Sequence, residues 1–226
     1  MQYFVTGATG FIGKRLVKTL LARKGATVYF LLRKESERKV PELLEYWGVT
    51  KARAIPVFGD LTTKKLGVAA DDIKGLKGDI DALFHLAAVY DLKADEETQI
   101  QANIEGTRNV VEFAKAIDAK HLHHVSSIAA AGLYEGVFRE DMFDEAENLD
   151  HPYFNTKHES EKIVRKESKV PWTVYRPAFV VGDSKTGEMD KIDGPYYFFK
   201  LIQRMRQLLP PWFPSVGLEG GRINIV

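Results

Sequence analysis

The chain of 226 residues contains no cysteine. Disulfide bonds, thiolate nucleophiles and cysteine-ligated zinc sites are therefore excluded, and nothing in the sequence requires an oxidising compartment. It also lacks a run of about 18 apolar residues, which a membrane-spanning helix would need. The first apolar run begins almost at once, so we expect no secretory signal peptide before it. These absences predict a cytoplasmic protein.

The chain also lacks a strong excess of either charge. Its 32 basic and 31 acidic residues leave a formal net charge of +1, so no long-range attraction to nucleic acid is expected. Its 45% hydrophobic and 28% charged residues are ordinary for a globular protein. At this length we expect one sizeable α/β domain, or one such domain and part of a second. No feature indicates the oligomeric state.

Short apolar runs alternate with longer segments of helical period. Strands are predicted over residues 3–6, 27–32, 52–57, 82–86, 121–126 and 172–176. The longest predicted helix spans residues 96–117, and its apolar stripe consists of Ile100, Ile104, Thr107, Val111 and Ala114. This alternation predicts an α/β fold: a Rossmann-like, doubly wound parallel sheet with helices on both faces.

Three glycines, Gly7, Gly10 and Gly13, follow the first predicted strand at three-residue intervals. There, Gly7 permits a tight turn, Gly10 lets the backbone approach phosphates, and Gly13 lets the next helix pack closely on the strand. The helix predicted over residues 11–23 directs its unpaired N–H groups at an anion. A glycine-rich turn without a ligand is the alternative. The segment predicts a pyrophosphate site formed by Gly7, Thr9, Gly10, Phe11, Ile12 and Gly13.

Basic residues end the second predicted strand. Arg33 and Lys34 occupy the place where an acidic residue usually contacts the ribose of NAD, and where a basic one suits the 2′-phosphate of NADP. Arg38, one turn later, and Lys14 and Arg15, after the glycines, add positive charge. These residues favour NADP(H) as the cofactor. Ordinary solvated surface cations are the alternative.

Tyr153 and Lys157 lie four residues apart, and thus on one face of a helix. A fixed cation stabilises a phenolate and lowers the pKa of tyrosine from about 10, which makes it a better proton donor at neutral pH. Ser126 and Ser127 end a predicted strand, at the edge where open α/β folds bind ligands. A chance pair on a surface helix, and serines that only cap the strand end, are the alternatives.

With this glycine pattern and these serine, tyrosine and lysine residues, the chain resembles the extended short-chain dehydrogenase/reductase superfamily. Further matching segments are Gly59-Asp60-Leu61, His85-Leu86-Ala87-Ala88, Asn103 to Thr107, and Tyr175-Arg176-Pro177. The resemblance implies that Asp60 and Leu61 lie by the adenine and that Ala87 and Ala88 line the cofactor cleft. It implies that Asn103 supports the active-site helix, and that His85 is structural support near the cofactor.

The resemblance also implies roles in catalysis. Ser127 would hydrogen-bond the substrate carbonyl, and it is chosen over Ser126 because it falls five residues before Gly132. Tyr153 would transfer its proton, and Lys157 would bind the nicotinamide ribose and tune Tyr153. The residues after the last motif, among them Pro177 and Val180, would meet the nicotinamide end.

Within the superfamily the chain is similar to the fatty acyl-CoA reductase branch, especially the amino-terminal reductase domain of bacterial multidomain enzymes of the male-sterility or thioester-reductase type. The similarity lies in residues 85–91, 123–132, 139–143 and 187–199. It implies NADPH-dependent reduction of a small-molecule substrate, a fatty acyl-CoA thioester or the derived aldehyde. A nucleotide-sugar epimerase or dehydratase, another carbonyl reductase, and an NADP sensor without activity are the alternatives.

The composition changes after Gly182. We expect an NADP-binding Rossmann domain with the catalytic residues over 1–182, and the beginning of a truncated substrate-binding region over 183–226. The run 223–226 is read as the start of a further strand.

One helical face in this region consists of Phe198, Ile202, Met205 and Leu209, with basic neighbours. A roof over the substrate cleft, an acyl-chain or CoA-phosphate contact, and a membrane-surface helix are the alternatives for it.

Three nearby histidines, His121, His123 and His124, do not predict a metal site. Strand alternation directs His123 away from its neighbours in sequence, and no histidine pair has the helical spacing with a glutamate that zinc hydrolases use.

Overall fold

The computed structural model of the chain describes residues 1–88, 96–190 and 195–208. The described strands are β1 (Gln2–Thr6), β2 (Thr27–Leu32), β3 (Ala54–Phe58), β4 (Ala82–His85), β5 (Leu122–Val125) and β6 (Trp172–Tyr175). They form one parallel sheet in the order β3-β2-β1-β4-β5-β6. The strand order turns back between β1 and β4, as in a Rossmann fold. The predicted fold class is confirmed, and no strand end differs from its prediction by more than two residues.

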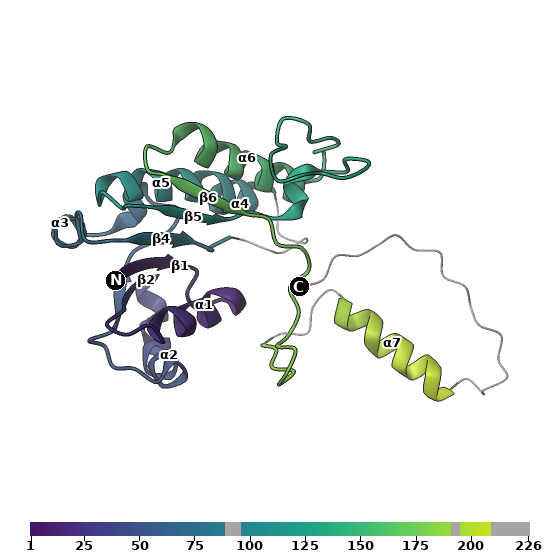
Figure 1. Ribbon diagram of the computed structural model, residues 1–226, viewed down its shortest axis with the longest axis horizontal. Coiled ribbons are helices and arrows are strands. Elements are labelled where there is room, and N and C mark those ends of the chain that lie inside the picture. Colours follow the sequence, from purple (N-terminus) through teal and green to yellow (C-terminus); the bar gives the residue numbers. More distant parts are fainter. Residues whose placement is uncertain (89–95, 191–194, 209–226) are drawn as a thin grey trace. The chain divides into compact units, whose positions relative to one another are not determined.

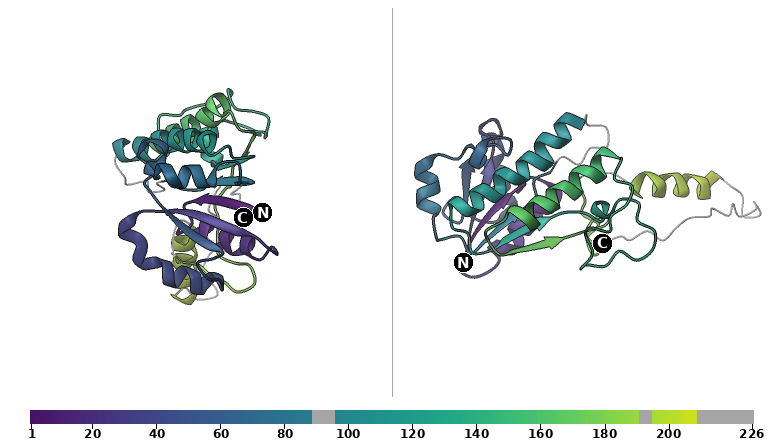
Figure 2. Two further views of the ribbon diagram at one scale, coloured as in Figure 1. Left: turned by 90° about the vertical axis from the view of Figure 1, so that its left-hand side faces the viewer. Right: turned by 90° about the horizontal axis from the view of Figure 1, so that it is seen from above.

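Helices cover both faces of the sheet. The described α-helices are α1 (Phe11–Leu21), α2 (Val40–Trp47), α3 (Ala70–Leu76), α4 (Glu96–Gln99), α5 (Gly106–Ala116), α6 (Pro152–Glu167) and α7 (Pro195–Leu208). Shorter helical segments are η1 (Lys34–Lys39), η2 (Lys64–Gly67), η3 (Ile100–Glu105) and η4 (Ile128–Ala131). Figure 1 shows α1 and α2 on one face and α5 and α6 on the other, and the left view of Figure 2 shows the same two layers after a turn of 90°.

The helix expected over residues 96–117 is not a continuous α-helix. Its middle part, η3, is a π-helix between α4 and α5. The wider turn changes which side chains point inward: Gln99 and Asn103 are buried, whereas Ile100 and Ile104 are only half-buried. The expected apolar stripe is correct in α5, and Ile104 of the π-helical part still packs against the core, whereas Ile100 is only half-buried.

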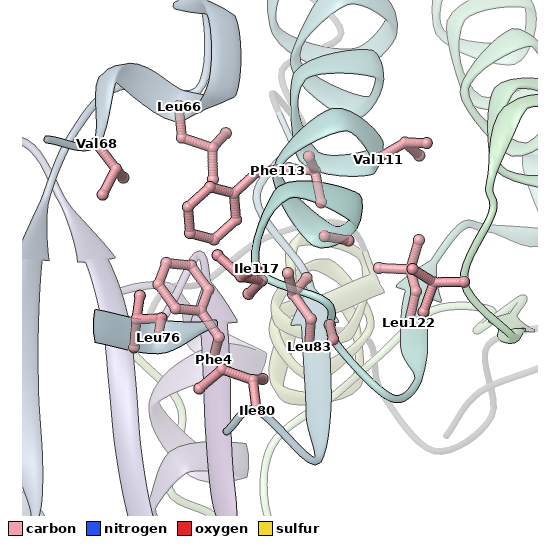
Figure 3. Packing of buried hydrophobic residues seen from close by; sticks show 14 of the residues in the cluster. Phe4, Leu66, Val68, Leu76, Ile80, Leu83, Val111, Phe113, Ile117 and Leu122 are labelled. Carbon is pink, nitrogen blue, oxygen red and sulfur yellow. The ribbon is translucent and has the colours of Figure 1, made fainter. Parts of the chain in front are cut away.

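Strand alternation divides the core into two apolar clusters. Phe4 of β1 faces α5, where its ring centroid lies 4.8 Å from that of Phe113, among the residues drawn in Figure 3. Its neighbours Tyr3 and Val5 face α1 and α2 instead. There Phe30 of β2 meets Trp47 of α2 edge-on, with ring centroids 5.3 Å apart.

The chain divides into two compact units, Met1–Arg176 and Pro177–Val226, and α7 belongs to the second. The domain boundary expected after residue 182 stays a prediction. Phe198, Ile202 and Met205 of α7 are exposed, whereas Leu209 and the terminal run 223–226 lie outside the described residues. Among the helices that the structure describes, none is both long and apolar enough to cross a membrane.

Candidate functional site

Glycines shape the turn after β1. Gly7 has a φ of +74°, which disfavours a side chain, and a Cβ atom there would lie 2.7 Å from the backbone nitrogen of Ala87. A Cβ atom on Gly13 would overlap the carbonyl oxygen of Gly7, so α1 could not pack as closely. Gly10 donates its N–H to the same oxygen at 3.0 Å and closes the turn. The turn has the shape that the glycine spacing predicts, while its ligand stays a prediction.

The start of α1 is open to an anion. Gly10 is the N-cap, no side chain caps the first turn, and no acidic residue lies in it. Thr9, Gly10 and Ile12 are exposed, and Phe11 is half-buried. The positive end of the helix dipole is therefore not compensated by a neighbouring side chain of the cap or first turn.

An open hollow of about 380 Å³ lies at the carboxyl ends of β2 and β3. Its lining consists of Arg33, Lys34, Glu35, Phe58, Gly59, Asp60, Thr63 and Gly67. Arg33 is exposed and forms no ion pair with any residue that the structure describes, whereas Lys34 pairs within η1 and lies over the ring of Phe58. Lys14 and Arg15, expected nearby, do not line it. Phe58 was not predicted from the sequence, because only the pairing of β2 with β3 brings it here.

Asp60 and Leu61 follow β3 in different surroundings. An Asp60 oxygen accepts hydrogen bonds from the hydroxyl of Thr62 at 2.6 Å and from its N–H at 2.8 Å. The hydroxyl bond is the largest cause that holds the pKa of Asp60 below 3.8; burial opposes it, and the charge of Arg33 adds to it. Leu61 is half-buried against Gly106, where a Cβ atom would lie 2.7 Å from the Leu61 side chain.

Lys157 is buried although it carries an amine. It is 4% exposed, and its Nζ donates to the carbonyl oxygen of Val125 at 3.1 Å, which ties α6 to the end of β5. Burial lowers the pKa of Lys157 from 10.5 to about 8, although the charge of Glu161 acts in the opposite direction. The sequence predicted this residue for the site but not its burial.

Tyr153 lies half-buried in the first turn of α6, four residues before Lys157. Its backbone N–H donates to Nδ1 of His151 at 3.1 Å. Ser127 follows β5, and its Oγ accepts the N–H of Ala129 at 3.1 Å, so Ser127 does cap η4. A hydroxyl that accepts one bond can still donate its proton, so capping does not remove Ser127 from the candidate site.

Asn103 points inward from the π-helical η3. It is 2% exposed, and its Nδ2 donates to the Thr156 hydroxyl at 3.3 Å. The bond links η3 to α6, between Tyr153 and Lys157. Asn103 is the buried residue of this π-helical segment.

Glu161 continues the spacing of Tyr153 and Lys157 by one more turn, and the sequence analysis overlooked it. It is fully buried and accepts hydrogen bonds from Arg176 at 2.6 and 3.0 Å and from Arg165 at 2.8 Å. Burial alone would raise the pKa of Glu161, but these arginines outweigh it and hold the pKa below 4.5. The third member of the four-residue spacing was the signal available in the sequence.

Four further predicted cofactor-binding residues lie just after β4 or in the second unit. Ala87 is half-buried and Ala88 exposed, directly after β4. Pro177 and Val180 are half-buried residues of the second unit.

The three histidines of β5 and its start contact protein groups. His121 bonds the Thr173 hydroxyl at 2.9 Å, and His123 bonds the Tyr175 hydroxyl at 3.0 Å. His123 points away from the buried His124, as expected, but not from His121, because the ring centroids of His121 and His123 lie 4.5 Å apart on the same side of the strand. Within the described ranges, no group of three or more histidine, aspartate or glutamate residues could hold a metal ion.

The chain is similar in sequence to known proteins over most of its length. The profile of the male sterility protein family matches residues 5–223. A linear gramicidin synthase from Brevibacillus parabrevis is 33% identical over 204 residues, which cover 84% of this chain and 4% of that protein. A putative fatty acyl-CoA reductase of Drosophila melanogaster is 27% identical, with 99% of this chain and 52% of the relative covered.

Among solved structures, the terminal R domain from the myxalamid PKS-NRPS biosynthetic pathway matches with a TM-score of 0.78. It is 30% identical, and the match covers 90% of this chain and 56% of that chain. The chain thus spans about half, or much less, of the length of the proteins it matches.

Proposed function

Because the chain belongs to the male sterility protein family of extended short-chain dehydrogenases/reductases, we propose that it is the cofactor-binding part of a reductase. The reaction is the NADPH-dependent reduction of a fatty acyl-CoA thioester or of the derived aldehyde. A relative named as a putative fatty acyl-CoA reductase, matched over 99% of this chain, supports this substrate class.

The observation that carries the proposal is the buried position of Lys157 beside the end of β5. It places an ammonium one helical turn from Tyr153 and against the backbone two residues before Ser127. The carboxyl ends of parallel strands are where open α/β folds bind ligands. A lysine on a solvated helix face, the alternative for this spacing, would not be 4% exposed.

The residues fit a dinucleotide. A Cβ atom would fill the space at Gly7, the first turn of α1 has no side-chain cap, and a hollow of about 380 Å³ opens at Arg33. Gly7, Gly10 and the start of α1 would hold the pyrophosphate, and Arg33 would hold the 2′-phosphate. When bound, reduced nicotinamide supplies the hydride.

Side chains of this protein stabilise the carbonyl oxygen of the substrate and supply the proton that it receives. Ser127 donates a hydrogen bond to the carbonyl oxygen, which stabilises the negative charge that develops there. Tyr153 donates its phenolic proton to that oxygen. An aldehyde substrate becomes the alcohol in this step, whereas a thioester becomes a hemithioacetal, whose C–S bond then breaks so that the thiol leaves with the hydroxyl proton and the aldehyde remains. Lys157, with a pKa of about 8, is mostly protonated at neutral pH. Its positive charge would stabilise the phenolate of Tyr153 and thereby make the phenol a better acid.

Arg33 supports the choice of NADPH over NADH. It is exposed beside the hollow and has no ion-pair partner among the described residues, so a 2′-phosphate could pair with it. Glu35 and Asp60 also line the hollow, and the charge of Lys34 is paired with Glu37, so the specificity depends on Arg33 against two acids. Arg33→Asp should raise the Kd for NADPH much more than the Kd for NADH. Equal changes in both would remove the NADP assignment.

A second candidate substrate is a thioester held on a synthetase. The similarity to a linear gramicidin synthase and to a terminal R domain of a PKS-NRPS pathway favours it. The Ser127, Tyr153 and Lys157 chemistry is the same for both thioesters, so the substrate must be separated by assay.

The test is oxidation of NADPH by the full-length protein with long-chain acyl-CoA, a carrier-bound acyl thioester, decanal or UDP-sugars. Turnover with acyl-CoA or decanal is expected, and Tyr153→Phe should abolish it while NADPH remains bound. Turnover with the carrier-bound thioester alone would select the second candidate. Epimerised sugar without net NADPH oxidation would overturn the proposal, as would NADPH binding with no turnover or full activity of Tyr153→Phe.

A further inference from the structure

Buried hydrogen bonds connect the turn after β4 with the first turn of α6. The first half of this path runs through His85. The N–H of Ala87 donates to the Thr6 hydroxyl at 3.3 Å, and the same hydroxyl lies 2.8 Å from Nδ1 of His85. On the other side of the ring, Nε2 lies 3.0 Å from the hydroxyl of Thr107.

The second half reaches the catalytic helix. The Thr107 hydroxyl donates to the carbonyl oxygen of Asn103 at 2.6 Å. The side-chain amide of Asn103 donates to Thr156 at 3.3 Å, and the Thr156 hydroxyl donates to the carbonyl oxygen of Tyr153 at 3.2 Å. We call these six bonds the buried path. Its five linking side chains, Thr6, His85, Thr107, Asn103 and Thr156, are each at most 2% exposed.

The partners determine the state of the His85 ring. Thr107 uses its single hydroxyl hydrogen on Asn103, so its oxygen can only accept from His85. Nε2 therefore carries the hydrogen, Nδ1 is bare, and Nδ1 accepts the hydrogen of Thr6. The oxygen of Thr6 is then free to accept the N–H of Ala87.

All six donors of the buried path point in the same direction, from Ala87 towards Tyr153. Hydrogen bonds in such a chain polarise and strengthen one another. The path requires a neutral ring, and burial, followed by the charge of Lys157, lowers the pKa of His85 to about 3. At neutral pH the ring is therefore neutral, as the partners demand.

The two ends of the path are functionally distinct. Ala87 lies against the nucleotide turn, where its nitrogen would be 2.7 Å from a Cβ atom on Gly7. Tyr153 is the proposed proton donor. No short segment of sequence joins these two places, since Thr6 and His85 are 79 residues apart and Asn103 and Thr156 are 53 apart.

We propose that His85 is a positioning residue that holds the first turn of α6, and with it Tyr153, in register with the nucleotide turn. It does so as the Nε2–H tautomer, through Thr6 on one side and Thr107 on the other. The inference rests on the proposed function for its kinetic readout, but not for its spectroscopic one.

Two pairs of variants cut the path on either side of the ring. The amide of asparagine can replace Nδ1, and the longer glutamine can replace Nε2. His85→Asn should therefore keep the Thr6 side and lose the Thr107 side, as Thr107→Val does. His85→Gln should keep the Thr107 side and lose the Thr6 side, as Thr6→Val does.

The expected result is a split pattern in the full-length protein. His85→Asn and Thr107→Val should lower kcat about tenfold at saturating NADPH and leave the Kd for NADPH within about twofold. His85→Gln and Thr6→Val should lower kcat by about the same factor, because the register with the nucleotide turn is lost on this side too, and should also raise that Kd about tenfold. A merely structural role would lower all four variants alike in both measurements, and that outcome would overturn the proposal.

A nitrogen NMR spectrum of the wild-type protein without cofactor tests the tautomer directly. A protonated Nε2 and a bare Nδ1 at His85 are expected, and a protonated Nδ1 would overturn the proposal even if every variant failed to fold. Absence of turnover with all substrates would refute the proposed function alone. The spectrum and NADPH binding, measured by fluorescence, would then still decide the role of His85.

Discussion

The two faces of the sheet bury different kinds of side chain. On the face covered by α1 and α2, the buried residues of both helices are apolar or glycine. The other face begins with an apolar cluster around Phe4 and Phe113 and becomes polar towards the carboxyl ends of the strands. The buried polar side chains of the described chain are Thr6, His85, Gln99, Asn103, Thr107, His124, Ser126, Thr156, Lys157, His158, Ser160 and Glu161. They come from β1, β4 and the end of β5, or from α4 to α6.

This difference separates two kinds of contribution to stability. Apolar burial stabilises the fold without regard to pH, whereas buried polar groups cost stability unless each finds a partner. The face with α5 and α6 also carries the candidate catalytic residues Asn103, Tyr153 and Lys157. On the polar face, we therefore expect the change in unfolding free energy caused by a substitution to depend on pH and on which hydrogen-bond or ion-pair partners remain. On the apolar face, we expect it to depend on neither.

The largest effect on the polar face is expected at Glu161. Glu161→Gln leaves Arg176 and Arg165 without the carboxylate they share, and removing one partner of a buried ion pair costs about 3–5 kcal/mol. The folded-state pKa of Glu161 lies below 4.5, so its contribution is complete above about pH 4.5 and is lost as the pH falls through the folded-state value. Urea unfolding from about pH 7 down to about pH 4 should therefore show the gap to wild type narrowing.

Phe30→Ala is the matched control on the apolar face. It opens a cavity beside Trp47 and should cost a similar amount, about 3–5 kcal/mol. No ionisable group titrates with Phe30, so its gap to wild type should stay constant over the same pH range. A gap for Glu161→Gln that is just as constant would contradict the contrast between the two faces.

The next effect is expected at Lys157, where a substitution should raise the free energy of unfolding instead of lowering it. Lys157 is held at a pKa of about 8 instead of 10.5, so its charged form destabilises the folded protein below about pH 8, and this cost disappears as the pH rises towards 10.5. Lys157→Met should therefore stabilise the protein by about 2 kcal/mol at neutral pH, even after loss of the bond to Val125. The gain should vanish near pH 10, and reductase activity should be lost.

Lys166→Met, an exposed lysine of the same helix, is the control for Lys157→Met. It should change stability by less than about 0.5 kcal/mol at any of these pH values. If Lys157→Met destabilised the protein at neutral pH, the buried ammonium would raise the free energy of unfolding instead of lowering it, which would contradict the prediction.

Local patterns in the sequence were sufficient to predict the fold class and the positions of the strands. The glycine turn, the strand positions and the shared helix face of Tyr153 and Lys157 all follow from spacings of about one turn of helix or one strand. The chain is shown to belong to the superfamily that these residues resemble. The roles of the site residues stay predictions.

The features that could not be predicted depend on contacts between distant segments. The π-helical turn at Asn103 breaks the α-helical period on which the expected stripe relied. Arg176 reaches Glu161 across fifteen residues only because β6 runs beside α6. Phe58 meets Arg33 at the hollow only through the pairing of β2 with β3. A period or a spacing within one segment contains no information about such pairs.

The smallest effect is expected at His124, and His85 on the same face is its comparison. His85 and His124 are paired in register on β4 and β5, with ring centroids 5.2 Å apart. Both nitrogens of His85 have partners, whereas neither nitrogen of His124 has a hydrogen-bond partner within the described chain. Burial, followed by the charges of His85 and Lys157, holds the pKa of His124 well below 6.5, so the ring is neutral at physiological pH.

A buried N–H without a partner is a cost that an apolar side chain would remove. His124→Leu should therefore leave thermal stability unchanged or raise it by up to about 1 kcal/mol, whereas His85→Leu should lower it by about 2 kcal/mol because Thr6 and Thr107 lose their partner. The two substitutions remove the same ring from neighbouring strands, so volume and strand propensity cancel in the comparison. Equal losses at both positions would mean that packing of the ring, and not its hydrogen bonds, decides the stability of this face.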